Sequence, residues 1–64
     1  MATEHVGDQI RRLRKLRGLT QHQLAAGTHF SVSLIKKVER GTVPASPALV
    51  AEAARALKVK PAHL

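Results

Sequence analysis

The sequence predicts an all-α fold, a compact bundle of short helices. Two helix patterns follow one another directly between residues 20 and 41, and each has its own start signal. Further helix patterns precede and follow this segment, and a chain of 64 residues has room for only one hydrophobic core. We therefore expect a single domain over residues 1–64, built from about five short helices.

The first helix is predicted to begin at Thr3 and to end before Gly18. Threonine is a favoured N-cap, and Glu4 and Asp8 follow where the helix dipole stabilises negative charge. Glycine suits the C′ position, where the backbone turns left-handed. Gly7 weakens this helix slightly without breaking it. The apolar residues at helical spacing, which we expect to face the core, are Val6, Ile10, Leu13 and Leu16.

Residues 20–41 predict two helices joined by a tight turn. Thr20 and Gln23 form the T-x-x-Q pattern of a capping box, in which each side chain bonds the other residue's backbone N–H. Ser31 is placed to cap the second helix, and Gly41 follows it where a left-handed C-cap belongs. Two helices so close in sequence must cross steeply, which is the helix-turn-helix arrangement. The expected helices are residues 21 to 27 or 28 and residues 32 to 40, with Leu24, Ala25, Ile35 and Val38 facing the core.

A fourth helix is predicted to begin after Ser46. Serine is a favoured N-cap, and Pro47 stands at the first helical position, where its fixed φ fits and no N–H is needed. Residues 42–45 form a proline-containing loop before this helix. After Lys60 and Pro61 the chain restarts, and its last four residues are typical of the first turn of a fifth helix. The expected core stripe of the fourth helix is Leu49, Ala53, Ala56 and Leu57.

The charge balance favours a polyanionic partner. Eleven Lys and Arg residues against four Asp and Glu residues give a formal net charge of +7, which attracts nucleic acid or an anionic membrane surface. The single aromatic residue, Phe30, argues against recognition of RNA or single strands, because such partners are bound by stacking on aromatic rings. Double-stranded DNA, which is read in its grooves, requires no such rings.

Several absences narrow the function further. The chain contains no cysteine and therefore has neither disulfides nor thiolate metal sites. Its apolar stretches are short, and its first residues lack the basic start and apolar run of a signal peptide, so we expect a cytoplasmic protein, which would be nucleoid-associated if nucleic acid is its partner. We expect no metal, no cofactor, no small-molecule ligand within this domain and no enzyme activity. The histidines lack the close spacing of a metal pair; they are His5, His22, His29 and His63.

Many residues also form a pattern with fixed spacing. It comprises I-R-x-L-R-x-x-R-G-L-T-Q at residues 10–21, L-A at 24–25, S-x-x-x-I at 31–35 and V-E-R-G at 38–41. The pattern resembles the phage repressor and Cro family of helix-turn-helix proteins, the xenobiotic-response-element type. The resemblance implies a repressor-like transcriptional regulator that binds double-stranded DNA sequence-specifically. It would act as a homodimer on a roughly palindromic operator, with its third helix in the major groove.

The resemblance also implies roles for individual residues. Reading of bases falls to the third helix, at Val32, Ser33, Lys36 and Lys37. Binding of backbone phosphates falls to Thr20, Gln21, Arg40 and Thr42. We expect Val32 to be exposed on the first turn of its helix, where it would contact a thymine methyl group.

Arg14 and Glu39 are implied to tie the first helix to the third. They form either a surface ion pair of small value or a partly buried pair, in which loss of one partner costs more than loss of both. The other cations of the first helix have a different interpretation. Because the family docks through its second and third helices, we interpret them as a solvated face that adds only long-range attraction. These cations are Arg11, Arg12 and Lys15.

Two positions depart from the family's pattern. His29 stands in the turn where the family has glycine, and a non-glycine residue at positive φ is strained. We therefore expect a differently shaped turn, with Gly27 ending the second helix early. Lys60 replaces a better N-cap before Pro61, so we expect the last turn to fray.

Two other functions fit the same residues less well. The fold also serves as an antitoxin or adaptor module that binds another protein, but Ser33, Lys36 and Lys37 are unlike the aromatic and aliphatic anchors of protein-facing surfaces. Binding to a membrane surface would need the apolar face of the first helix, which the core already uses. We also expect the chain to be the N-terminal domain of a longer regulator, in which a dimerisation or ligand-sensing part follows.

Overall fold

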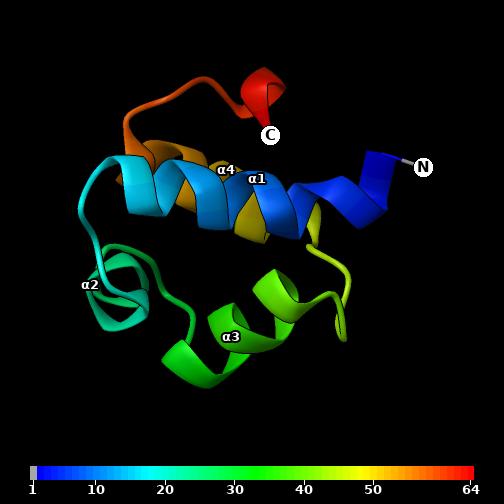
Figure 1. Cartoon of the computed structure of the whole chain (residues 1–64), viewed down its shortest axis with the longest axis horizontal. Helices are drawn as coiled ribbons and strands as arrows, with labels where there is room; N and C mark the ends of the chain where they lie inside the picture. The colour runs from blue at the N-terminus through cyan, green and yellow to red at the C-terminus, as the bar shows by residue number, and fades with distance from the viewer. Residues whose placement is uncertain (1) are drawn as a thin grey trace.

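The computed structural model is a bundle of four α-helices followed by a short 3-10 helix (Figure 1). It describes the backbone of residues 2–64 and the side chains of residues 6–64. The helices are α1 (Ala2–Leu16), α2 (Gln21–Ala26), α3 (Val32–Arg40), α4 (Pro47–Leu57) and η1 (Pro61–His63). No strand occurs in residues 2–64. The predicted all-α fold is therefore confirmed, with a 3-10 turn as its fifth element.

The N-terminal helix begins slightly earlier than predicted. α1 starts at Ala2, one residue before Thr3. The side chains of Thr3 and Glu4 lie outside the described residues, and so does the capping predicted for them. None of the helices in residues 2–64 has both the length and the apolar surface that crossing a bilayer would require.

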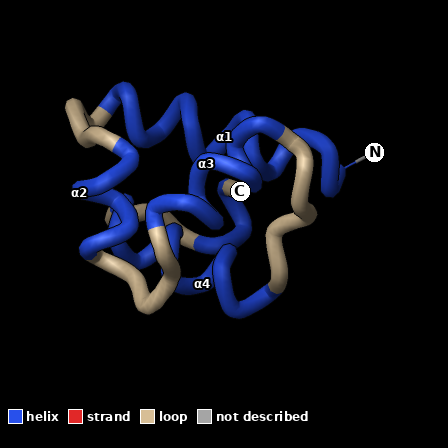
Figure 2. Tube along the Cα trace, turned by 90° about the horizontal axis from the view of Figure 1, so that it is seen from below, coloured by secondary structure: helices blue, strands red, loops and turns tan. Residues whose placement is uncertain are grey.

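The helices surround one hydrophobic core (Figure 1, Figure 2). α1 packs against α3 and α4, and α2 packs against the same two helices. Every α-helix contributes a residue whose side chain is almost completely removed from water, which is the main source of stability in so small a domain. The largest of these side chains are Ile10, Leu24, Ile35, Leu49 and Leu57.

The predicted caps of α2 and α3 are confirmed. Thr20 Oγ1 accepts from the backbone N–H of Gln23 at 3.0 Å, and Gln23 Oε1 accepts from the backbone N–H of Thr20 at 2.8 Å. Ser31 Oγ accepts from the backbone N–H of Leu34 at 3.1 Å. Gly41 ends α3 in the left-handed region, with φ at 86°. Both helices of the predicted helix-turn-helix thus begin and end where their local hydrogen bonds dictate.

α4 begins as predicted and ends less favourably. Ser46 Oγ accepts from the backbone N–H of Leu49 at 3.2 Å, and Pro47 is the first helical residue. Lys58 forms the C-cap at φ 61°, a left-handed conformation that a lysine adopts at some cost. The core stripe differs by one position from the prediction, because Ala54 is fully buried and Ala56 only half-buried.

One prediction for the core face of α1 is wrong. Leu16 is 73% exposed. At about 100° per residue, Leu16 lies about 120° around the helix from Ile10, which is completely buried. The position four residues after Ile10, on the same side of the helix, belongs to Arg14, and Arg14 is buried instead.

Gly7 lies at a close contact between α1 and α3. It is buried, and a Cβ atom added at this position would overlap the carbonyl oxygen of Val38. The sequence shows Gly7 only as a residue that weakens a helix. The structure shows that it allows the two helix backbones to meet, which brings α3 into its position on the bundle.

Candidate nucleic-acid interface

The exposed side of α3 carries only polar and cationic side chains, which we call the outer stripe. Its members are Ser33, Lys36, Lys37 and Arg40. They recur at the i, i+3, i+4, i+7 spacing that places residues on one side of a helix, and the opposite side is buried in the core. The outer stripe therefore offers hydrogen-bond donors and positive charge, without an acidic or aromatic side chain.

Val32 does not belong to the outer stripe. It is half-buried and packs against the core. The expectation that it is exposed is wrong, because Val32 lies three residues before Ile35 and therefore on the same side of α3. A contact between Val32 and a thymine methyl group stays a prediction, with only part of the side chain accessible for it.

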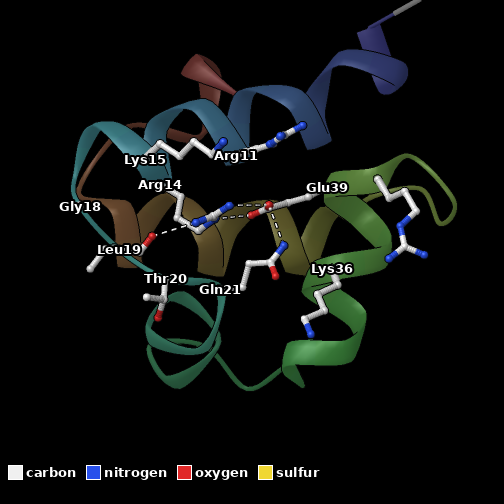
Figure 3. Close-up of a pocket in the computed structure, with 10 residues that line it drawn as sticks. Arg11, Arg14, Lys15, Gly18, Leu19, Thr20, Gln21, Lys36 and Glu39 are labelled. Atoms are coloured by element: carbon white, nitrogen blue, oxygen red, sulfur yellow. Dashed lines mark hydrogen bonds and ion pairs between the residues drawn. The ribbon is translucent and has the colours of Figure 1, made fainter.

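A groove lies between α1, the start of α2 and α3, and we call it the basic groove (Figure 3). In Figure 3 the side chains of Arg14, Gln21 and Glu39 meet in its centre. Cationic side chains outnumber acidic ones in its walls by five to one. The cations are Arg11, Arg14, Lys15, Lys36 and Arg40, and the acid is Glu39. Two members of the outer stripe, one lysine and one arginine, thus also border the groove.

Arg14 and Glu39 form a buried, bidentate ion pair. Arg14 Nε donates to Glu39 Oε2 at 2.8 Å, and Arg14 Nη2 donates to Glu39 Oε1 at 3.0 Å. Arg14 Nη1 donates to the carbonyl of Leu19 at 2.9 Å. The two residues are only 8% and 7% exposed. Of the two alternatives, the buried pair is present; it ties α1 to α3, and removal of one partner would leave an uncompensated buried charge.

Thr20 and Gln21, two of the predicted phosphate-binding residues, both line the basic groove. Gln21 Nε2 donates to Glu39 Oε1 at 3.1 Å, which links α2 to the buried ion pair. The amide has a second N–H, and the hydroxyl of Thr20 keeps its own hydrogen while accepting the capping bond. Both residues thus retain a donor for an anion. Their contact with phosphate stays a prediction.

Arg40 and Thr42 flank the C-cap of α3, and both are exposed. The backbone N–H of Thr42 donates to the carbonyl of Lys37 at 2.9 Å, which completes a Schellman-type helix end around Gly41. Only the side chain of Thr42 is therefore accessible for the phosphate contact that the resemblance implies. Arg40 extends from the same end of the helix into the wall of the basic groove.

The turn between α2 and α3 avoids a positive φ at His29, as expected for a turn that is shaped differently from the family's. Among the described residues, Lys58 is the one non-glycine residue with positive φ. The turn is held instead by hydrogen bonds from two of its residues. Thr28 Oγ1 donates to the carbonyl of Ala25 at 2.9 Å and accepts from the backbone N–H of Phe30 at 3.0 Å. The expected early end of α2 is confirmed, because Gly27 is its C-cap.

His29 connects the turn to α4 through Glu52. The backbone N–H of His29 donates to Glu52 Oε1 at 2.6 Å, and His29 Nδ1 lies 3.0 Å from the same oxygen. These two hydrogen bonds, the backbone bond first, lower the pKa of the Glu52 carboxyl from its ordinary value because they favour the ionised form. Since the partners are separated by 23 residues, no local pattern indicates this contact.

The cations of α1 do not form one uniform face. Arg11 and Lys15 line the basic groove, and Arg12 does not. Arg17, directly after the end of α1, has yet another role, because its Nε donates to the carbonyl of Leu57 at 2.6 Å, at the C-terminus of α4 where the helix dipole favours a cation. Sequence reasoning treats Arg11, Arg12 and Lys15 alike. The signal that separates them is spacing, because Arg11 and Lys15 lie on the side of α1 that also carries Arg14.

The chain is similar to one protein family, to a relative of known sequence and to two solved structures. A family model described as a helix-turn-helix domain matches residues 5–64. The uncharacterized HTH-type transcriptional regulator YazB of Bacillus subtilis (strain 168) is 39% identical over 59 residues, which cover 92% of this chain and 86% of YazB. The crystal structure of the restriction-modification controller protein C.AhdI from Aeromonas hydrophila matches with a TM-score of 0.90 and 31% identity, over 97% of this chain and 94% of that one. The clp gene regulator ClgR from C. glutamicum matches with a TM-score of 0.89 and 29% identity, over 97% of this chain and 80% of that one.

Proposed function

The chain belongs to the helix-turn-helix family of DNA-binding transcription regulators, of the repressor and Cro type, and we propose that it recognises a specific operator in double-stranded DNA. In this proposal α3 lies in the major groove of the DNA. Ser33, Lys36 and Lys37 of the outer stripe read base edges, and Arg40, Thr42 and the residues at the start of α2 hold backbone phosphates. The observation that carries the proposal is the outer stripe itself.

The outer stripe suits the major groove in shape and in chemistry. An α-helix with its side chains is about 10–12 Å across, and the major groove is about 12 Å wide. Ser31 and Gly41 cap the two ends of α3, and the buried ion pair between Glu39 and Arg14 fixes the inner side of α3 to α1. A helix that is already formed presents its donors without a further cost of ordering its backbone on binding.

The accessible side chains divide into two groups by position. Ser33 in the first turn of α3 and Lys36 and Lys37 in its middle are exposed. A lysine can donate to O6 and N7 of guanine, and a serine can bond several base edges. The residues at the margins would hold phosphates and fix the register of the helix on the DNA. They are Thr20, Gln21, Arg40 and Thr42.

We further propose that two copies act together as a repressor on a palindromic operator. The few base-reading side chains of one α3 discriminate only a short half-site. Two copies related by a two-fold axis would place their α3 helices one helical turn of DNA apart, roughly 34 Å. A pair bound across a promoter would block transcription, and such DNA binding would place the protein at the nucleoid.

The adaptor function has less support from the described residues. The outer stripe offers no aromatic or aliphatic anchor, and such anchors carry most of the energy at protein interfaces. Leu16 is the one large hydrophobic residue that is exposed among residues 6–64, and it lies on α1 outside the outer stripe.

Selection of bound duplexes from random DNA tests the proposed function. We expect an enriched motif of two inverted half-sites, with centres about 10 base pairs or a multiple of that apart. Failure to enrich any motif would contradict sequence-specific binding and favour the adaptor function. A single half-site without symmetry would support DNA recognition and contradict the homodimer.

A further inference from the structure

We propose that Arg11 and Lys15 of α1 bind a phosphate of the DNA backbone in the basic groove, so that the contact with DNA extends beyond the helix-turn-helix. This inference rests on the proposed DNA binding. It also reverses the interpretation of these residues from sequence, in which all the exposed cations of α1 form a solvated face.

The geometry brings cations of two helices to one groove. Arg11 and Lys15 come from α1, and Lys36 and Arg40 come from α3. All four side chains are exposed. In Figure 3, Arg11 and Lys15 lie on α1 above Arg14, with Lys36 on α3 below it. A groove lined in this way holds four accessible positive charges on two of its walls.

The one acid of the groove does not neutralise these charges. Glu39 accepts two hydrogen bonds from Arg14 and one from Gln21, and it is buried. Among residues 6–64 the ion pairs are Arg14–Glu39 and His29–Glu52, so the four exposed cations of the groove have no carboxylate partner there. Like charges around one groove repel each other, and an anion bound between them would relieve this repulsion.

The basic groove is continuous with the outer stripe. Lys36 and Arg40 belong to both, so a duplex that lies on the outer stripe would carry its backbone past the groove. The guanidinium of Arg11 can bond two phosphate oxygens at once, and Lys15 adds a mobile point charge. The walls carry no aromatic ring, which agrees with a phosphodiester rather than an unstacked base as the occupant.

Arg12 provides a matched control. It has the same charge as Arg11, is exposed, and is adjacent to it on α1, but it does not line the groove. Replacing either arginine by alanine changes the net charge of the protein equally. Any difference between the two variants therefore measures local contact rather than long-range attraction.

The experiment is a salt titration of DNA binding. Fluorescence anisotropy would give the affinities of the wild type, R11A, K15A and R12A for a random duplex and for the selected operator between about 50 and 200 mM salt. For each phosphate that a variant chain no longer neutralises, we expect the slope of log affinity against log salt to become shallower by about 0.9. R11A and K15A should show this change on both duplexes, because a phosphate contact carries no sequence information. R12A should keep the wild-type slope.

The outcomes separate this inference from the proposed function. If wild type binds the operator but R11A and K15A keep its slope, or if R12A changes as much as they do, α1 makes no phosphate contact while DNA binding stands. If wild type binds neither duplex, the proposed function itself is wrong. Thermal unfolding of each variant, followed by circular dichroism, must match wild type, as expected for exposed positions.

Discussion

Charged side chains have opposite environments on the two sides of α3. On the inner side, Glu39 is buried and each of its oxygens accepts a hydrogen bond from Arg14. On the outer side, Lys36, Lys37 and Arg40 are exposed and have no ion-pair partner among residues 6–64. A buried charge needs a partner within the fold, whereas an exposed one is free to bind a partner outside it. We therefore expect inner substitutions to change folding and outer substitutions to change only binding.

The largest effect should follow from removal of one half of the buried ion pair. Arg14→Met leaves the Glu39 carboxylate buried without its partner and should lower the free energy of unfolding by about 3–5 kcal/mol. The double variant Arg14→Met/Glu39→Met should lose less, because no uncompensated charge remains. Chemical denaturation followed by circular dichroism measures both. A double variant less stable than the single one would contradict the argument that burial of an unpaired charge dominates.

The close approach of α1 to α3 should be the next most sensitive feature of the inner side. Gly7→Ala forces a Cβ atom against the carbonyl of Val38 and should cost about 1–3 kcal/mol in unfolding free energy, although alanine is the better helix former. Arg12→Ala, at an exposed position of the same helix, is the control and should change stability by less than about 0.5 kcal/mol. Equal stability of the two variants would show that the helix backbones do not meet at Gly7.

Substitutions in the outer stripe should leave stability unchanged and alter binding. Lys37→Ala should weaken binding to the selected operator by about 1–3 kcal/mol and hardly affect random DNA, because the contact that we propose for Lys37 is with a base. Arg40→Ala should weaken binding to both duplexes alike, because it removes a phosphate contact. Fluorescence anisotropy distinguishes the two patterns. Equal losses on both duplexes from both variants would disprove the division between base-reading and phosphate-binding residues.

The smallest expected effect concerns the turn that leads into α3. Here the contribution of Glu52 to stability should depend on pH. Hydrogen bonds from His29 lower the pKa of Glu52 in the folded state, so near pH 4 the unfolded chain binds more protons than the folded one, and stability rises with pH there. This stabilisation is complete above the ordinary pKa of glutamate, about 4.3, and is lost as the pH falls through that value toward the lower folded-state pKa. Glu52→Gln should abolish it.

The measurement for Glu52 is a comparison of melting temperatures. The difference in Tm between wild type and Glu52→Gln should be constant at about pH 5.5 to 6 and should shrink as the pH is lowered to about 3. A difference that does not change with pH over this range would show that His29 does not stabilise the ionised carboxyl.

The errors in prediction show where reasoning from sequence reaches its limit. Leu16 is apolar and lies at roughly helical spacing, yet it is exposed, while Arg14 is buried. A pattern of hydrophobicity ranks leucine above arginine at a core position. Only the presence of Glu39 opposite Arg14 reverses that order, and the two residues are separated by 25 positions.

The turn provides a second example. The family has glycine where this chain has His29, and this difference predicts a differently shaped turn but not the contacts that shape it. The backbone of His29 has no positive φ and donates to Glu52 on α4. The shape of the turn depends on a carboxylate that a local pattern cannot include. Arg11 and Arg12 are equivalent by composition. Helical spacing separates them only once the buried Arg14 shows which side of α1 faces the basic groove.

The starts of α2, α3 and α4, the all-α fold and the cationic outward side of α3 follow from the amino-acid sequence alone. These features depend on hydrogen bonds that span three residues, as at Thr20, Ser31 and Ser46, and on the spacing of charges within one helix. Packing between distant segments is what buries Arg14, partly covers Val32 and places Arg11 in a groove. Partners that are distant in the sequence set the free-energy cost of burying a charged side chain. A pattern of neighbouring residues therefore cannot predict which charges are buried.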